Sequence, residues 1–198
     1  MPYFVASFET KGLVVECLTE MSTQSSEARA LFCKSSGIPV MTEFMFLTES
    51  VPRHQYQCCQ FIYIFAKDEK LQYELVGDGV ALQISNAMSL HPEYADVQHI
   101  SCKALSEIAK LTHNEIMNFG IAEHVLNILK NHTDLEDLVQ DTCKLLARLT
   151  LLEPSYASMM TEICSFDLER ILHRIKYKFP NQALVCDTLL KKIKSVVN

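Results

Sequence analysis

Histidines and cysteines are the residues of this sequence whose types and spacing could do chemistry. The chain holds seven His and eight Cys among 198 residues. His99 and Cys102 stand three residues apart, which puts both on one face of a helix as half of a zinc site, and Cys58 and Cys59 are adjacent. A structural zinc needs four ligands from paired short motifs, and the sequence has no C-x-x-C and no H-x-x-x-H. We therefore expect no metal and no cofactor.

Nucleophilic catalysis by cysteine would need a histidine close to the thiol in the folded chain. With so many residues of both types, chance pairs are common, so composition alone is no evidence for such a pair. The fingerprints of serine hydrolases, P-loop proteins and dinucleotide-binding proteins are absent from the sequence. The sequence therefore predicts that the chain is not an enzyme, and a thiol of low pKa would reopen that alternative.

The composition indicates a folded helical chain. Hydrophobic residues make up 48% and charged residues 21%, while only five Gly and six Pro interrupt the sequence. Few breakers favour helices over many short strands and turns. The start, MPYFVASFETKG, lacks the pattern of a signal peptide, and the longest apolar run, FIYIFA, is too short to span a membrane. We expect a cytoplasmic or nuclear protein whose cysteines are free thiols.

Charge is spread unevenly along the chain. The net charge is −6, yet residues 169–198 hold seven Lys or Arg against Glu169 and Asp187. The acidic remainder argues against nucleic acid as a partner. The basic end is predicted to be a solvated helix, and contact with an acidic protein, a phosphate or a membrane surface stays open as an alternative.

A repeat in the sequence places several of the cysteines at regular intervals. Three glycines recur at intervals of 42 and 41 residues, each before an apolar stretch: Gly37, Gly79 and Gly120. A cysteine follows each glycine after 22 or 23 residues, at Cys59, Cys102 and Cys143. Two of these cysteines lie in nearly the same local sequence, SCKALSEIA and TCKLLARLT. A period near 42 is typical of helical repeat arrays, in which each unit buries its apolar face against its neighbours.

Each unit is predicted to contain two long helices, preceded by a short helix that ends at the glycine. Apolar side chains recur at helical spacing after Val97 and after Leu135, which makes Leu105 and Leu146 equivalent core positions. The turn between the short and the long helix favours a left-handed glycine. The stretch CCQFIYIFA resembles a strand in composition, but its place in the repeat predicts a buried helix.

The pattern of a short helix, a glycine turn and two longer helices resembles the armadillo repeat, and CKALSEIA is similar to the core of that family's third helix. The resemblance implies an all-α, right-handed α-solenoid of about three full repeats with a partial repeat at each end, as one domain over residues 1–198. Because the first unit starts in mid-repeat, we expect a fragment or product of a longer array.

Family members that read nuclear-localisation signals hold the peptide with a ladder of Trp and Asn on the concave face. This sequence has no Trp, and the places of the Asn ladder carry Glu20, Ile64, Glu107, Arg148 and Lys192. The resemblance therefore implies a non-enzymatic protein-interaction or scaffold module that binds a protein or peptide segment along this row. The alternative is a regulatory appendage separated from a larger, for example kinase-like, enzyme.

Overall fold

The computed structural model describes residues 7–77, 79–152 and 167–197, and all regular structure in these ranges is helical, as the sequence predicts. The elements are α1 (Phe8–Gln24), α2 (Ser26–Lys34), α3 (Gly37–Leu47), α4 (Pro52–Ala66), the 3-10 helix η1 (Gln72–Leu75), α5 (Val80–Leu90), α6 (Ala95–Asn118), α7 (Ile121–Asn131), α8 (Glu136–Leu152), a helix over 167–178, the 3-10 helix η2 (Pro180–Gln182) and α10 (Ala183–Val197). Within the described ranges, no helix combines the length and apolarity needed to cross a membrane.

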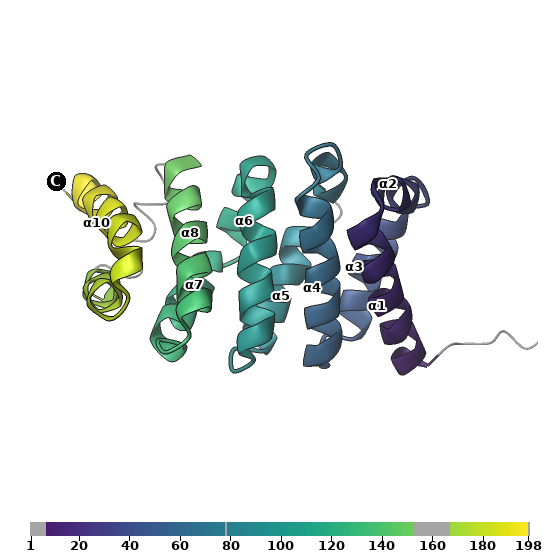
Figure 1. The fold of residues 1–198 in the computed structure, drawn as a ribbon, viewed down its shortest axis with the longest axis horizontal. Helices are drawn as coiled ribbons and strands as arrows, with labels where there is room; N and C mark the ends of the chain where they lie inside the picture. The colour runs from purple at the N-terminus through teal and green to yellow at the C-terminus, as the bar shows by residue number, and fades with distance from the viewer. Residues whose placement is uncertain (1–6, 78, 153–166, 198) are drawn as a thin grey trace, which may run out of the picture.

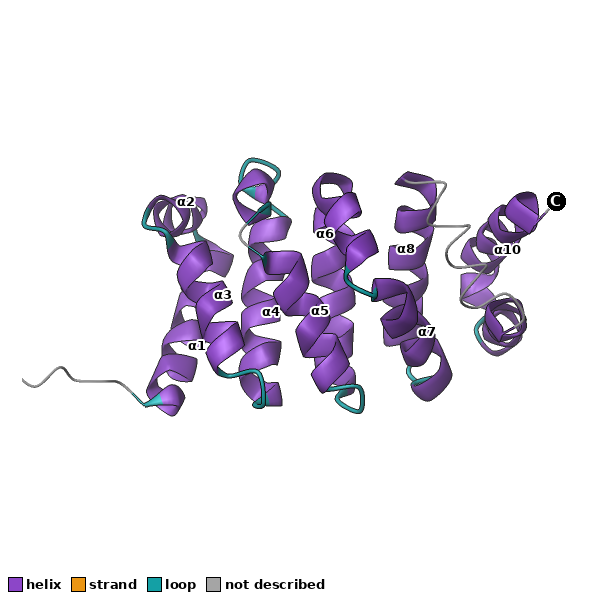
Figure 2. Cartoon of the chain, turned by 180° about the vertical axis from the view of Figure 1, so that it is seen from behind, coloured by secondary structure: helices purple, strands orange, loops and turns teal. Residues whose placement is uncertain are grey.

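The helices form two layers. The front layer contains α1, α4, α6, α8 and α10, which stand side by side in chain order from one end of the molecule to the other (Figure 1). Each of these helices packs against the next one in that order. Seen from behind, α3, α5 and α7 cover the front layer (Figure 2). We call the outer surface of the front-layer helices the row face.

The core lies between the two layers and between neighbouring front-layer helices. Leu105 and Leu146 are 0% and 1% exposed, so the predicted core positions are confirmed. The stretch CCQFIYIFA forms the second half of α4, where Phe61 and Phe65 are fully buried. The helical interpretation of this stretch is therefore correct, because a helix that buries one side along its whole length explains the apolar and aromatic composition as well as a strand would.

Equivalent residues of successive front-layer helices make equivalent contacts. Gln55 is the fourth residue of α4 and Gln98 the fourth of α6, and each side-chain amide bonds carbonyls ten and seven residues earlier. These bonds tie the start of a front-layer helix to the end of the back-layer helix before it. At the fourth position of α8, the apolar Val139 is fully buried instead.

Histidines that follow the back-layer helices connect neighbouring units. His91 ends α5, and its Nε2 lies 2.7 Å from the carbonyl oxygen of Glu49. His132 ends α7, and its Nε2 lies 2.8 Å from the carbonyl oxygen of Pro92. Both histidines thus bond the backbone of the preceding interhelical link, so the links are held in register along the row.

Two of the three predicted glycine turns are confirmed. Gly79 and Gly120 both have φ of +70° and precede α5 and α7. The prediction is wrong for Gly37, because the left-handed residue of that turn is Ser36, with φ of +57°. Gly37 instead lies against the ring of Phe32, and a Cβ built on it would come within 2.2 Å of that ring. Close packing, and not backbone conformation, therefore requires glycine at this position.

The short helices before the glycines differ from one another. The first is the separate helix α2, and the second is the 3-10 helix η1. The third does not form a separate element, because α6 continues without a break to Asn118. Residues 112–118 contain neither Gly nor Pro, so nothing in this stretch interrupts the helix before Gly120.

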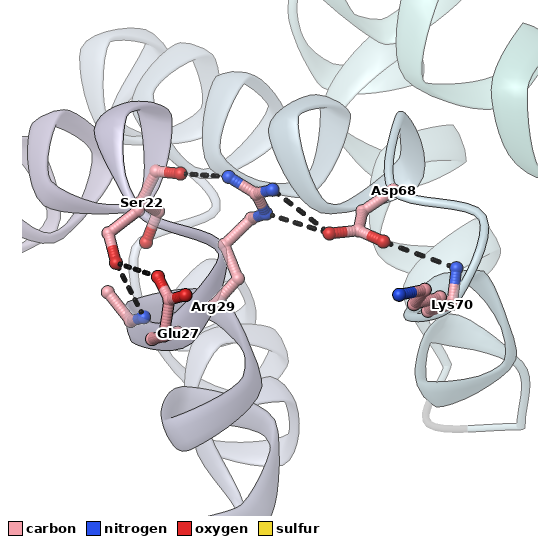
Figure 3. A network of polar contacts seen from close by, with 7 residues as sticks. Ser22, Glu27, Arg29, Asp68 and Lys70 are labelled. Carbon is pink, nitrogen blue, oxygen red and sulfur yellow. Dashed lines mark hydrogen bonds and ion pairs between the residues drawn. The ribbon is translucent and has the colours of Figure 1, made fainter.

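A partly buried ion pair attaches α2 at the end of the row (Figure 3). The guanidinium of Arg29 donates from Nε and Nη2 to Asp68 Oδ2, at 3.2 and 2.9 Å, and from Nη1 to the carbonyl oxygen of Ser22 at 2.6 Å. The side chains of Arg29 and Asp68 are each only 17% exposed. Arg29 therefore joins the end of α1 to the link that follows α4.

Candidate functional site

The predicted binding residues lie one on each front-layer helix. Ile64, Glu107 and Arg148 occupy the thirteenth position of α4, α6 and α8, and Glu20 and Lys192 lie on α1 and α10. Glu20 is exposed and the other four side chains are half-buried. The structure brings Glu107 and Arg148 into direct contact, whereas Glu20, Ile64 and Lys192 lie on three other front-layer helices.

Glu107 and Arg148 form an ion pair between α6 and α8. Arg148 Nη1 lies 3.5 Å from Glu107 Oε2, and the same nitrogen donates a short hydrogen bond to the carbonyl oxygen of Ser106. The side chain of Arg148 is 41% exposed and that of Glu107 is 32% exposed. The predicted change from acidic to basic residues along the row therefore lies between Glu107 and Arg148, and the charges of these two side chains offset one another.

A cavity of about 400 Å³ opens on the row face beside this pair. Its lining combines residues of α4, α6, α8 and α10, among them Tyr63 and Val185. Three cations line it, Lys103, Lys144 and Arg148, against two carboxylates, Glu107 and Asp141. The cavity thus carries an excess of positive charge although the whole chain has a net charge of −6.

Asp141 holds the basic side chains of this cavity in place. Its carboxylate accepts hydrogen bonds of 2.9 Å from Lys144 Nζ and from His99 Nε2, and Lys103 Nζ lies 3.7 Å away. Burial opposes ionisation of Asp141, but the hydrogen bonds from Lys144 and His99 outweigh it and lower the pKa of the carboxyl. The ionised Asp141 therefore links α6 to α8 across the floor of the site.

Sequence reasoning missed Lys103 and Lys144. Each lysine directly follows one of the repeated cysteines, as the CK of SCKALSEIA and of TCKLLARLT, and lies four residues before Glu107 or Arg148. Residues four apart on a helix share a face. The repeated CK dipeptide was therefore the signal that could have placed two cations next to the predicted pair.

His99 and Cys102, which were considered as half of a metal site, make separate contacts in the structure. Among the described residues, no group of three or more His, Cys, Asp or Glu is placed to hold a metal ion. His99 bonds Asp141, while the Cys102 thiol lies 3.5 Å from the Thr142 hydroxyl. Burial raises the pKa of Cys59 and of Cys102 to about 12, so both remain protonated thiols at neutral pH.

Cys143 and Cys186 form a buried pair between α8 and α10. A hydrogen bond between the two thiols lowers the pKa of Cys186, and the neighbouring Cys186 together with burial raises the pKa of Cys143 well above its ordinary range. Both side chains are 0% exposed. The lowered pKa therefore belongs to a thiol that a substrate does not reach.

An apolar groove of about 310 Å³ lies at the α1 end of the row, between α1 and α3. It is lined mainly by aliphatic and aromatic side chains, such as Val14, Leu18, Val40 and Leu47. It contains none of the predicted residues. The cavity beside Arg148 offers both cations and an apolar wall, whereas this groove offers mainly apolar contacts.

No family model matches the chain, and neither a curated protein nor a solved structure is significantly similar to it. Any proposal about function therefore rests on the fold and on the cavity beside Arg148.

Proposed function

We propose that the chain is a non-enzymatic protein-interaction module whose row face binds an extended segment of a protein partner. The two layers would be a right-handed α-solenoid of about three full armadillo-like repeats with a partial repeat at each end. The recurrent bonds of Gln55 and Gln98, and those of His91 and His132, support a repeating unit. The row face would then be the concave surface of the array, and the protein would act in the cytoplasm or nucleus.

The observation that carries this proposal is the cavity around Arg148. It crosses several front-layer helices, so a segment lying across the row would pass over it. Within the described ranges, Arg148 uses only Nη1 for its contacts with Ser106 and Glu107, and Lys103 lies beyond hydrogen-bond distance of Asp141. Both cations therefore retain N–H donors for a carboxylate of the partner. Leu151 and Val185 offer an apolar wall for a neighbouring side chain.

Charged groups at such a rim change the rate of association and its dependence on salt more than they change affinity. The test begins with a random peptide library displayed on phage and selected on the immobilised chain. The association rate of a selected peptide is then measured against salt concentration for the wild-type chain and for Arg148→Glu. We expect the variant to associate roughly tenfold more slowly at low salt, with a flatter salt dependence.

Lys34→Glu is the matched control, because Lys34 is exposed on α2 and makes no ion pair among the described residues. Both variants change the net charge by the same amount, so a general effect of charge would slow both equally. Circular dichroism melts would establish that both remain folded. Equal association rates for Arg148→Glu and Lys34→Glu would contradict binding at the row face.

A further inference from the structure

The α1 end of the row carries an uncovered apolar surface. α1 and α3 stand last in their layers at this end, and the apolar groove of about 310 Å³ lies between them (Figures 1 and 2). Val14 of α1 is 51% exposed and Val40 of α3 is 61% exposed, and both side chains line the groove. We call the surface formed by Val14, Leu18, Val40 and Leu47 the end face.

The register of the front-layer helices explains why Val14 is exposed. Val14 is the seventh residue of α1, and the seventh residues of α4, α6 and α8 are all 0% exposed: Cys58, Ser101 and Thr142. This position faces the preceding front-layer helix. The Ser101 hydroxyl lies 3.5 Å from the Cys59 thiol of α4, and the Thr142 hydroxyl lies 3.5 Å from the Cys102 thiol of α6. Val14 therefore faces the place of a helix before α1, which the described part of the chain leaves open.

Val40 occupies the corresponding place in the back layer. It is the fourth residue after the left-handed Ser36, just as His124 is the fourth residue after the left-handed Gly120. His124 lies against the preceding back-layer helix, because its Nε2 is 3.2 Å from the Ser85 hydroxyl of α5. Val40 therefore also faces the place of a preceding helix. Both layers thus end with an exposed valine at a position that contacts a neighbouring helix elsewhere in the row.

The opposite end of the row carries charge at the equivalent contact position. The eighth residue of a front-layer helix faces the next helix, and in α4, α6 and α8 it is a cysteine: Cys59, Cys102 and Cys143. Cys143 bonds Cys186 of α10, so Asp187 takes the next place in this series. Asp187 pairs with Lys176 of the helix over 167–178 at 2.6 Å. The α10 end therefore has a polar outer surface of the kind that stacked helical units need at their ends to stay soluble, and the end face does not.

We propose that two copies of the chain pair through their end faces. A two-fold pair brings the same surface of each copy together, so the apolar side chains of one copy cover those of the other. Contacts between neighbouring front-layer helices already hold the row together, and the pair continues this kind of contact from α1 of one copy to the second copy. The pairing goes beyond the proposed function, because it leaves the row faces of both copies open.

Charge favours this arrangement over a head-to-tail stack of copies. A head-to-tail stack would place the end face against Asp187 and Lys176, and removal of this ion pair from water against an apolar surface is unfavourable. The groove itself has two charged lining residues of opposite sign, Lys11 and Glu43, so two identical end faces bring no net charge together. The pair should therefore close as a dimer and not grow into a filament.

Sedimentation equilibrium of the whole chain tests the pairing. Two helices of each copy form a small contact of modest affinity, so the concentrations should reach about 300 µM. We expect the wild-type chain to form dimers and nothing larger. Val14→Glu and Val40→Glu should each raise the dissociation constant of the dimer about tenfold, because each would bury a carboxylate in an apolar contact. Both valines are more than half exposed in one copy, so circular dichroism melts should show that the variants stay folded.

Leu184→Glu is the matched control, because Leu184 is 79% exposed on α10 at the opposite end of the row and the substitution adds the same charge. It should leave the dissociation constant unchanged. Equal weakening by Leu184→Glu and Val14→Glu, or species that grow beyond a dimer, would contradict the pairing of end faces. A wild-type chain that stays monomeric at about 300 µM would overturn the proposal in favour of another occupant of the groove, such as a helix of a different protein.

A mixture of Val14→Glu and Val14→Lys tests the two-fold symmetry. Each variant alone brings like charges together in the dimer, whereas the mixture brings opposite charges together. We therefore expect the mixture to form dimers about threefold more tightly, or better, than either variant alone. Association of the mixture no tighter than that of the separate variants would contradict the contact between two end faces.

Discussion

Gln55 and Gln98 make the same pair of hydrogen bonds from equivalent positions of α4 and α6. The Gln55 amide bonds the carbonyl oxygens of Met45 and Thr48 at 2.9 and 3.0 Å, and the Gln98 amide bonds those of Met88 and His91 at 2.9 Å each. Similar side chains that satisfy similar backbone groups 43 residues apart are the strongest sign of a repeating unit in this chain.

Replacing Gln98 by leucine should destabilise the chain by about 1–3 kcal/mol, because two buried carbonyls would lose their donor. Gln98 is 2% exposed, so water does not take over these bonds. Gln83→Leu is the control, since Gln83 is half-buried and its side chain makes no hydrogen bond within the described part of the chain. Urea melts of the two variants are the measurement. Equal losses of unfolding free energy in Gln98→Leu and Gln83→Leu would contradict the stabilising role assigned to the Gln98 hydrogen bonds.

Truncating Leu105 or Leu146 to alanine should cost about 2–5 kcal/mol in each case, the range for fully buried leucines. The two side chains are 0% and 1% exposed on α6 and α8. Leu151→Ala, on a side chain that is 61% exposed, is the control and should change stability little. Chemical denaturation would measure all three, and losses below about 1 kcal/mol at both core positions would contradict the equivalence.

Gly120 and Gly37 should respond differently to the same substitutions. A Cβ at Gly120 meets no atom within 4 Å, so alanine there costs about 1–2 kcal/mol through the left-handed backbone, and asparagine costs less. At Gly37 the obstacle is the Phe32 ring, so asparagine has no advantage over alanine. Thermal melts of Gly120→Ala, Gly120→Asn, Gly37→Ala and Gly37→Asn measure these differences in stability. If Gly37→Asn were more stable than Gly37→Ala, the backbone conformation and not the Phe32 ring would be the constraint at Gly37.

Stability should fall on mild acidification, in part through His124. Burial lowers the pKa of His124 below its ordinary 6.5, and Nε2 lies 3.2 Å from the Ser85 hydroxyl. Because the folded state resists protonation, this contribution is present above about pH 6.5 and is lost as the pH falls through the folded-state pKa. The loss is at most about 1.4 kcal/mol per pH unit.

His124→Gln should therefore flatten the decline in unfolding free energy between pH 7 and pH 5, because glutamine still bonds Ser85 but does not titrate. His173→Gln is the control, on a side chain that is 58% exposed. Urea unfolding at several pH values gives the slopes. Unchanged slopes for His124→Gln would assign the acid sensitivity to other groups, such as His54.

The period of the sequence was enough to predict the helices, the equivalence of Leu105 and Leu146, and the turns at Gly79 and Gly120. These features depend on local spacing and on which side of a helix is apolar. The role of Gly37 was out of reach, because it depends on where the Phe32 ring lies after the chain turns. The length of α6 was also missed, since residues 112–118 favour either a short separate helix or a continuation.

The site was predictable only in part, for a related reason. Register placed Glu107 and Arg148 on the same row, but their mutual pairing depends on side-chain reach between two helices. Gln57 Oε1 is buried and has no hydrogen-bond partner among the described residues, whereas Nε2 of the same amide bonds Glu16 of a different helix. Contacts between helices decide which polar groups are satisfied, and a single sequence does not contain that geometry.

The most direct test of the proposed function is a map of where a bound peptide touches the chain. A peptide selected on the wild-type chain is added to isotope-labelled protein, and backbone amide shifts are compared between the two layers. Binding at the row face predicts the largest changes around Lys103, Glu107, Lys144 and Arg148, with little change at the back-layer residues Gln83 and Asn127. The largest changes on α5 and α7, with none near Arg148, would contradict the proposal that the row face is the binding surface.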